Sequence, residues 1–178
     1  MKGAVLLLLI AGVAFPLVVG YHVDPVSANL SGWTHRGDNV SQVLTINFDE
    51  LDSTSGAYCE LFAGSRGAGG AYHVSVRTYP GDFEVATGDT HGNVDHKWVK
   101  FNLGVTYPES IVKGKQLEFR FTRSGSDSIQ FYYQGGNPSL SDPYPWGWMR
   151  VGGADEVCMD LCARVYGHPK VGGQATAA

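Results

Sequence analysis

Residues 116–122, QLEFRFT, alternate strictly between apolar and polar side chains. The apolar members, Leu117, Phe119 and Phe121, are separated by single polar residues. Successive side chains of a β-strand point to opposite faces of a sheet, so this spacing predicts a strand with one buried face and one wet face. A helix would require a period near 3.6 residues, which the segment lacks.

Other segments alternate in the same way, and turn-forming residues separate them. They are residues 43–48, 58–64, 72–79, 83–87, 98–103, 128–134 and 157–166. Glycine, with 24 of 178 residues, has about twice its usual share. Frequent glycine between short apolar runs indicates many tight turns. The sequence therefore predicts an all-β fold, an antiparallel β-sandwich of jelly-roll type with eight or nine strands.

The N-terminus has the parts of a secretory signal peptide. Lys2 precedes an apolar run at residues 4–20, and small residues come before Tyr21. A second cleavage point lies after Ala28. The rival interpretation is an uncleaved membrane anchor, but the run is short for a span and Pro16 interrupts it. No second apolar run follows, so we expect no transmembrane segment after cleavage and a secreted, periplasmic or cell-surface protein.

This interpretation divides the chain into four parts. They are a signal peptide at residues 1–20, a lead-in segment at 21–38, a β-sandwich domain at 39–167 and a disordered tail at 168–178. The formal net charge of −4 argues against a nucleic-acid partner, which would call for a basic surface. No Gly-x-Ser-x-Gly, His-Glu-x-x-His or phosphate-loop motif is present, so we expect a protein that is not an enzyme.

Four stretches carry a family resemblance: DNVSQVLTI, HKWVKFNL, VKGKQLEFRFT and DLCARVYG. The chain from residue 39 to residue 167 resembles secreted bacterial β-sandwich domains, similar to galactose-binding-like and carbohydrate-binding-module jelly rolls. The resemblance implies a non-catalytic module that binds glycans. Such domains are often attached to larger enzymes or adhesins, whereas we expect this one to stand without a catalytic partner.

Aromatic residues between 126 and 153 are the candidates for glycan binding. Flat rings can stack on the apolar side of a sugar while amide and carboxylate groups bind its hydroxyls. The predicted ligand-binding residues are Tyr132, Asn137, Asp142, Tyr144, Trp146 and Trp148. Tyr132 shares a strand face with two glutamines, so we expect it to face water. The two tryptophans sit in a proline-stiffened loop, although either indole could instead cap the core. Trp98 lies on the polar face of its predicted strand. Either a loop covers this tryptophan or it belongs to a binding face.

A loop at residues 88–96 has ligands that suit calcium. Asp89, Asn93 and Asp95 carry hard oxygen atoms in a glycine-containing segment. The spacing is not that of an EF-hand, and ordinary solvated turns also favour Asp and Asn. A structural calcium is the one cofactor that the sequence suggests.

The three cysteines leave the disulfide state open. Cys158 and Cys162 lie four residues apart on one predicted strand, which separates them by about 13 Å. A disulfide needs Cα atoms within about 7 Å, so these two should not pair. Cys59 could pair with either one, or all three thiols could be reduced. The position of Cys59 in the alternation predicts an inward thiol.

Two functional hypotheses follow. The first is a non-catalytic secreted or cell-envelope module that binds a polysaccharide or cell-surface glycan. The alternative is a structural or assembly protein that packs through sheet edges and aromatic side chains without a small ligand.

Overall fold

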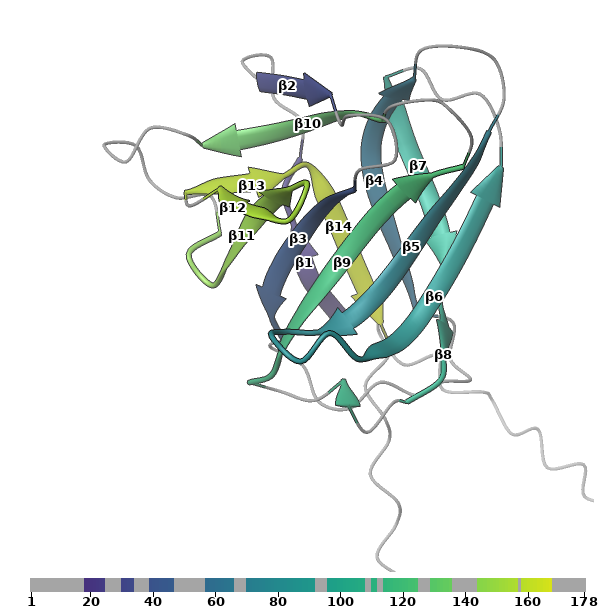
Figure 1. The fold of residues 1–178 in the computed structure, drawn as a ribbon, viewed down its shortest axis with the longest axis vertical. Helices are drawn as coiled ribbons and strands as arrows, with labels where there is room; N and C mark the ends of the chain where they lie inside the picture. The colour runs from purple at the N-terminus through teal and green to yellow at the C-terminus, as the bar shows by residue number, and fades with distance from the viewer. Residues whose placement is uncertain are drawn as a thin grey trace, which may run out of the picture.

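The computed structural model is an antiparallel β-sandwich of two seven-stranded sheets (Figure 1). It describes residues 18–24, 30–33, 39–46, 57–65, 70–91, 96–107, 110–111, 114–124, 129–135, 144–156 and 158–167. These residues form fourteen strands and no α-helix. The all-β antiparallel prediction is confirmed, although the strands are shorter and more numerous than the eight or nine expected.

We call the first layer sheet A. Its strands in spatial order are β1 (Val18–His22), β14 (Ala163–Gly167), β4 (Tyr58–Ser65), β10 (Ile129–Gly135) and β13 (Met159–Leu161). Two more strands complete it: β7 (Lys97–Asn102) pairs with β4, and β2 (Leu30–Trp33) pairs with β10. All of these pairings are antiparallel.

We call the second layer sheet B. Its strands in spatial order are β12 (Ala154–Glu156), β11 (Gly147–Val151), β3 (Val40–Thr45), β9 (Gln116–Arg123), β5 (Ala71–Thr78), β6 (Glu84–His91) and β8 (Gly104–Val105). In Figure 1 the short strands β11 and β12 lie at one edge of this sheet and β8 lies at the other.

The inner faces of the two sheets carry the residues that the alternation selected. On β9 these are Leu117, Phe119 and Phe121, all buried. Phe101 of sheet A approaches Phe121 of sheet B with 5.5 Å between ring centroids, so these rings join the two layers. Burying one such side chain contributes roughly 1.5–3 kcal/mol, which makes the paired inner faces the main source of stability.

One glycine lets the edges of the two sheets meet. A Cβ atom on Gly88 of β6 would lie 2.7 Å from the carbonyl oxygen of Asn102 on β7. Real Cβ atoms essentially never come that close to backbone. A side chain at position 88 would therefore force β6 of sheet B away from β7 of sheet A.

A buried polar contact also links the layers. Gln42 of β3 donates from Nε2 to Oδ1 of Asp160 on β13 at 2.7 Å, and its Oε1 accepts the backbone N–H of Leu161 at 2.9 Å. Oδ2 of Asp160 accepts the backbone N–H of Tyr144 at 2.9 Å. Gln42 and Asp160 are almost fully buried, so these bonds are needed to offset the loss of water.

The segment at residues 157–166 differs from its prediction as one strand. It divides into β13 and β14, which pair with different neighbours. Cys158 has a positive φ of 65°, which a continuous strand does not allow. At Cys162 the N–H donates to Tyr132 of β10 and the carbonyl accepts from Phe62 of β4. The chain changes partner there, and that pairing was not visible in the alternation.

Sheet A extends into the N-terminal region that the sequence assigned to the leader and lead-in segments. Strand β1 begins at Val18 and pairs with β14. Tyr21 is buried, and its hydroxyl donates to the carbonyl of Leu161 at 2.6 Å. Asp24 forms an ion pair with Arg164 of β14. In the part of the chain that the structure describes, no helix is long and apolar enough to cross a membrane.

The two cleavage points should therefore differ in their effect on folding. A chain that begins at Tyr21 keeps the buried ring and Asp24, whereas a chain that begins at Asn29 loses both. Deleting a buried aromatic side chain typically costs roughly 3–5 kcal/mol, so the shorter chain should have a clearly lower urea midpoint. Equal midpoints for the two chains would contradict the role of Tyr21 in the core.

The three cysteines are free thiols in the structure. Cys59 is fully buried, as its place in the alternation predicted, and burial raises its pKa far above the ordinary value. Cys162 is also buried, and burial together with the charges of Asp24 and Asp160 raises its pKa to about 12. Cys158 is only half-buried.

Alkylation should report these environments. Because the thiolate is the reactive form, iodoacetamide should modify Cys158 of the native protein long before Cys59 and Cys162. After denaturation without reductant, mass spectrometry should count three labelled thiols. A count of one would show a disulfide and contradict the structure.

Candidate functional site

The outer face of sheet B carries a set of charged side chains arranged by strand register. Arg150, Ser41 and Arg120 are direct cross-strand neighbours on β11, β3 and β9. Two residues along, Glu118 of β9 lies opposite Val43 of β3 and Arg77 of β5. Residues two apart on a strand share a face, so these rows lie side by side on the outside of the sheet.

Glu118 is the centre of this set. It is only 2% exposed, yet its carboxylate accepts from three donors. Oε1 accepts from Ser41 Oγ at 2.6 Å and from Arg150 Nη1 at 3.0 Å, and Oε2 accepts from Arg120 Nη2 at 2.6 Å. Burial alone would raise the pKa of Glu118, but these hydrogen bonds and the charges of both arginines outweigh it and lower the pKa. The carboxylate is therefore held in its charged form.

Ion pairs extend from Glu118 across the sheet in both directions. Asp82 Oδ1 accepts from Arg120 at 3.0 Å and from Arg77 at 2.8 Å, and Arg77 also pairs with Glu84 at 3.1 Å. On the other side Arg150 donates to Asp155 at 2.6 Å. We call this set the ion-pair chain: Glu84, Arg77, Asp82, Arg120, Glu118, Arg150 and Asp155. Its charges alternate in sign from β6 to β12.

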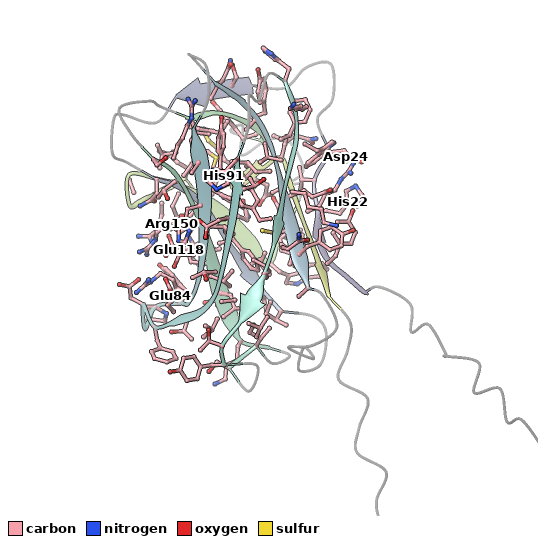
Figure 2. All side chains as sticks on the ribbon, turned by 90° about the vertical axis from the view of Figure 1, so that its right-hand side faces the viewer. His22, Asp24, Glu84, His91, Glu118 and Arg150 are labelled. Carbon is pink, nitrogen blue, oxygen red and sulfur yellow. The ribbon has the colours of Figure 1, made fainter. Side chains whose placement is uncertain are left out.

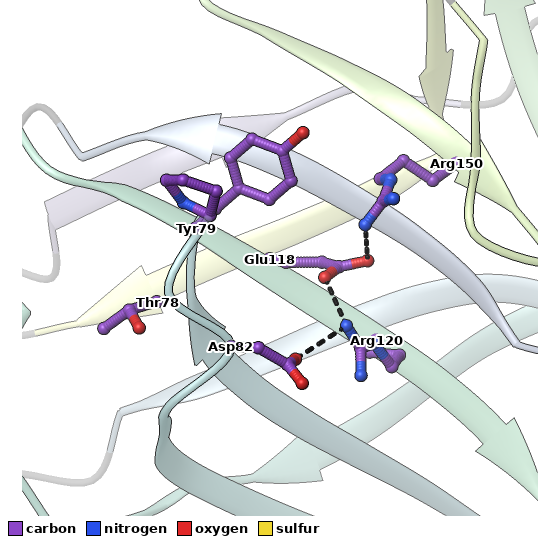
Figure 3. Close-up of a pocket in the computed structure, with 7 residues that line it drawn as sticks. Thr78, Tyr79, Asp82, Glu118, Arg120 and Arg150 are labelled. Atoms are coloured by element: carbon purple, nitrogen blue, oxygen red, sulfur yellow. Dashed lines mark hydrogen bonds and ion pairs between the residues drawn. The ribbon is translucent and has the colours of Figure 1, made fainter.

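A cleft of about 230 Å³ opens over the middle of the ion-pair chain (Figure 3). Its lining residues are Thr78, Tyr79, Pro80, Asp82, Glu118, Arg120 and Arg150. Figure 3 shows Glu118 between the two arginines that bind it. The first four lining residues come from the end of β5 and the turn that leads into β6. A turn is thus held against the charged face.

Tyr79 supplies an aromatic wall to the cleft. The Arg150 guanidinium lies over its ring, 5.4 Å from the centroid, and the Trp148 ring meets it edge-on at 5.4 Å. Both contacts hold the Tyr79 ring in place. Trp148 lies on β11 opposite Val43 of β3, so the indole that packs against Tyr79 is carried by a strand of sheet B.

Several polar atoms at the cleft are left without partners in the described part of the chain. Asp82 Oδ2, the Tyr79 hydroxyl and Nη1 of Arg120 take part in no hydrogen bond there. Nε of Arg120 and the indole N–H of Trp148 are buried without a partner. Unpaired buried donors of this kind cost about 1–3 kcal/mol each. Because protein covers both atoms, they are not binding groups for a ligand in the cleft.

The structure separates the three aromatic residues predicted for the 144–148 loop. Trp148 lies on strand β11, half-buried against Tyr79, rather than in a loop. Trp146 is 66% exposed and meets Tyr144 edge-on at 5.8 Å. Tyr144 packs against buried Tyr21 at 4.9 Å. Of the predicted ligand-binding residues that the structure describes, only Trp148 contacts the lining of the cleft.

The expectation that Tyr132 faces water is wrong. Tyr132 does point to the outer face of sheet A with Gln130, but it is only 9% exposed. Phe62 of β4 covers it edge-on at 5.2 Å, and the His96 ring lies 5.5 Å away. The glutamines beside Tyr132 in the sequence suggested a solvent-facing position, but they carry no information about Phe62 on the neighbouring part of sheet A, which covers the Tyr132 ring.

The outer face of sheet A lies on the opposite side of the molecule from the cleft. Figure 2 shows Glu118 and Arg150 on one side and His22 and Asp24 on the other. Trp98 on this second face is half-buried, because Arg164 covers its ring at 3.9 Å. Tyr132 and Trp98 therefore do not converge with Trp148 on one surface.

Of the three predicted calcium ligands, the structure describes only Asp89. Asp89 is exposed and pairs with His73 at 2.8 Å. Asn93 and Asp95, like the predicted ligand-binding residues Asn137 and Asp142, lie outside the described residues. Within the described ranges, no three His, Cys, Asp or Glu side chains gather in a way that could hold a metal ion.

The cleft could not be predicted from the sequence. Residues 80–82 lie between the predicted strands 72–79 and 83–87, Arg120 occupies a polar position of the 116–122 alternation, and no pattern singles out Arg150. The one available signal was the density of charge on the polar positions of residues 116–122. Comparison with protein-family models gives no match for this chain, and comparison with curated protein sequences gives none either.

The lowered pKa of Glu118 predicts a pH-dependent stability. Because the folded pKa lies below the unfolded value of about 4.3, the ionised carboxylate stabilises the fold at neutral pH. This contribution should be lost as the pH falls from about 4.3 through the folded pKa. Urea midpoints of wild type and Glu118→Gln should differ most at pH 7 and converge as the pH falls below the folded pKa. Parallel curves would contradict the prediction.

Proposed function

We propose that this protein is a non-catalytic glycan-binding module, and that the cleft on sheet B is its binding site. The observation that carries the proposal is the combination of an aromatic wall, Tyr79, with polar groups held rigidly around it. Sugar sites need a ring face for the C–H groups of the sugar and fixed donors and acceptors for its hydroxyls. The Tyr79 ring and these polar groups border one cavity of about 230 Å³.

The charge balance of the cleft favours a neutral sugar. Arg120 and Arg150 are matched by Asp82 and Glu118, and each arginine already donates to a carboxylate. A phosphate or sulfate group would have to compete with these carboxylates. A sugar hydroxyl can instead donate to Asp82 Oδ2 and accept from Arg120 Nη1, which fits the open atoms.

The protonation of the two carboxylates favours binding over hydrolysis. A glycosidase needs one carboxyl group with a raised pKa to protonate the leaving oxygen. Hydrogen bonds from Arg77, followed by the charges of nearby arginines, lower the pKa of Asp82, and the pKa of Glu118 is also lowered. Neither group is suited to be the acid.

The proposed location follows from the N-terminal segment. A basic residue and an apolar run at residues 1–20 are typical of a signal peptide, so we propose that the mature protein lies outside the cytoplasm. Polysaccharides and cell-surface glycans are the ligands available there. The alternative assembly role would need no sugar, and light scattering would detect it as a mass that rises with concentration.

Affinity electrophoresis on a panel of soluble neutral and acidic polysaccharides tests the proposal. We expect wild type to be retarded by at least one neutral polysaccharide. Tyr79→Ala should weaken this retention about tenfold, which corresponds to about 1.4 kcal/mol, whereas Tyr79→Phe keeps the ring and should retain most of it. Asp82→Asn should also weaken retention through loss of a charged acceptor.

Trp146→Ala is the matched control, because it removes an exposed ring that does not line the cleft. We expect it to keep wild-type retention. If Trp146→Ala abolishes retention and Tyr79→Ala does not, the site is the 144–148 segment rather than the cleft. Thermal melts of all variants identify any loss that comes from unfolding, and retention by no polysaccharide would reject the proposal.

A further inference from the structure

A pair of exposed aromatic rings lies next to the turn that lines the cleft. Phe83 is 50% exposed and Tyr107 is 40% exposed, with 4.9 Å between their ring centroids. Among the described residues, the only other large hydrophobic side chain this exposed is Trp146. Apolar rings in water are unfavourable, so a contacting pair at one place indicates a binding role more strongly than single exposed residues do.

Phe83 of this ring pair follows directly on the turn that lines the cleft. Asp82 lines the cleft and Phe83 is the next residue. The Thr78 N–H donates to the Phe83 carbonyl at 2.8 Å, and the Phe83 N–H donates to Thr78 Oγ1 at 3.1 Å. The turn between Thr78 and Phe83 is thus closed by two hydrogen bonds at its base.

Charged contacts then fix the same turn to the sheet. Arg77 donates to the Asp82 backbone carbonyl at 2.6 Å, and Arg120 donates to the Asp82 carboxylate at 3.0 Å. On the other side, Tyr107 is held by its N–H, which donates to the carbonyl of Val85 on β6 at 3.2 Å. The backbones of Phe83 and Tyr107 are therefore both hydrogen-bonded to sheet B.

The cleft is too small to hold a ligand longer than about one sugar unit. A volume of about 230 Å³ is below the roughly 300–1,000 Å³ of pockets that enclose drug-sized ligands. It has room for about one sugar ring, so the remaining units of a glycan chain would have to lie on the surface beside it. The Phe83–Tyr107 pair offers an apolar surface one residue from the lining.

We propose that Phe83 and Tyr107 form a second sugar subsite, so that the protein binds internal stretches of a neutral polysaccharide rather than single terminal sugars. The inference rests on the proposed glycan-binding function of the cleft. One unit of the chain occupies the cleft against Tyr79, and a neighbouring unit stacks on the exposed ring pair. The affinity should then grow with chain length.

Calorimetric titration with cello-, xylo-, manno- and chito-oligosaccharides of one to six units tests this inference. For the series that binds, wild-type affinity should rise at least tenfold from the single sugar to the longer chains. Phe83→Ala and Tyr107→Ala should remove most of that rise and leave binding of the single sugar unchanged. Phe83→Trp keeps a ring and should restore the dependence on length.

Tyr166→Ala is the control for loss of a ring elsewhere, because Tyr166 stacks on Tyr58 on the outer face of sheet A. It should leave the length dependence as in wild type. A rise that persists in Phe83→Ala overturns the second subsite while the cleft stands, provided that Tyr79→Ala still weakens binding about tenfold. If no oligosaccharide binds, or if Tyr79→Ala has no effect, the cleft is not a glycan site and this inference fails with it.

Discussion

A charged carboxylate that is almost completely covered by protein must be neutralised by its neighbours, and Glu118 places that constraint at the centre of sheet B. Ser41 of β3 and Arg150 of β11 satisfy one oxygen, and Arg120 of β9 satisfies the other. Strands β3, β9 and β11 must therefore keep the register that brings these groups together. The same Arg120 binds Asp82, so the turn that walls the cleft depends on this one carboxylate.

The two outer faces of the sandwich use their side chains differently. On sheet A the rings cover one another or are covered by cations: Lys100 lies 3.8 Å above the ring of Tyr58, and Arg164 lies over Trp98. On sheet B the arginines bind carboxylates, and Arg150 also lies over the ring of Tyr79, which borders the cleft with open polar atoms. Because ion pairs already hold these side chains, binding a ligand on sheet B would cost little further side-chain entropy.

The core of this protein could be predicted well and its candidate site poorly. Leu117, Phe119 and Phe121 are buried as the alternation required. Strands β11 and β12 were missed, because Gly and Pro residues around positions 143–153 suggested a loop. Gln42 and Asp160 also escaped notice, since a polar side chain is expected to face water unless a partner across the core is known.

By itself, the sequence determined the all-β class, the inward face of most long strands and the buried position of Cys59. These follow from local spacing, because a strand turns every second side chain to the same side whatever its partner. Only the tertiary structure decided that Tyr132 is covered, that Trp148 stands behind Tyr79, and that three arginines and four carboxylates form one chain. Those features depend on which strands are neighbours, and pairing between residues such as Ser41 and Glu118, 77 positions apart, leaves no periodic trace in a single sequence.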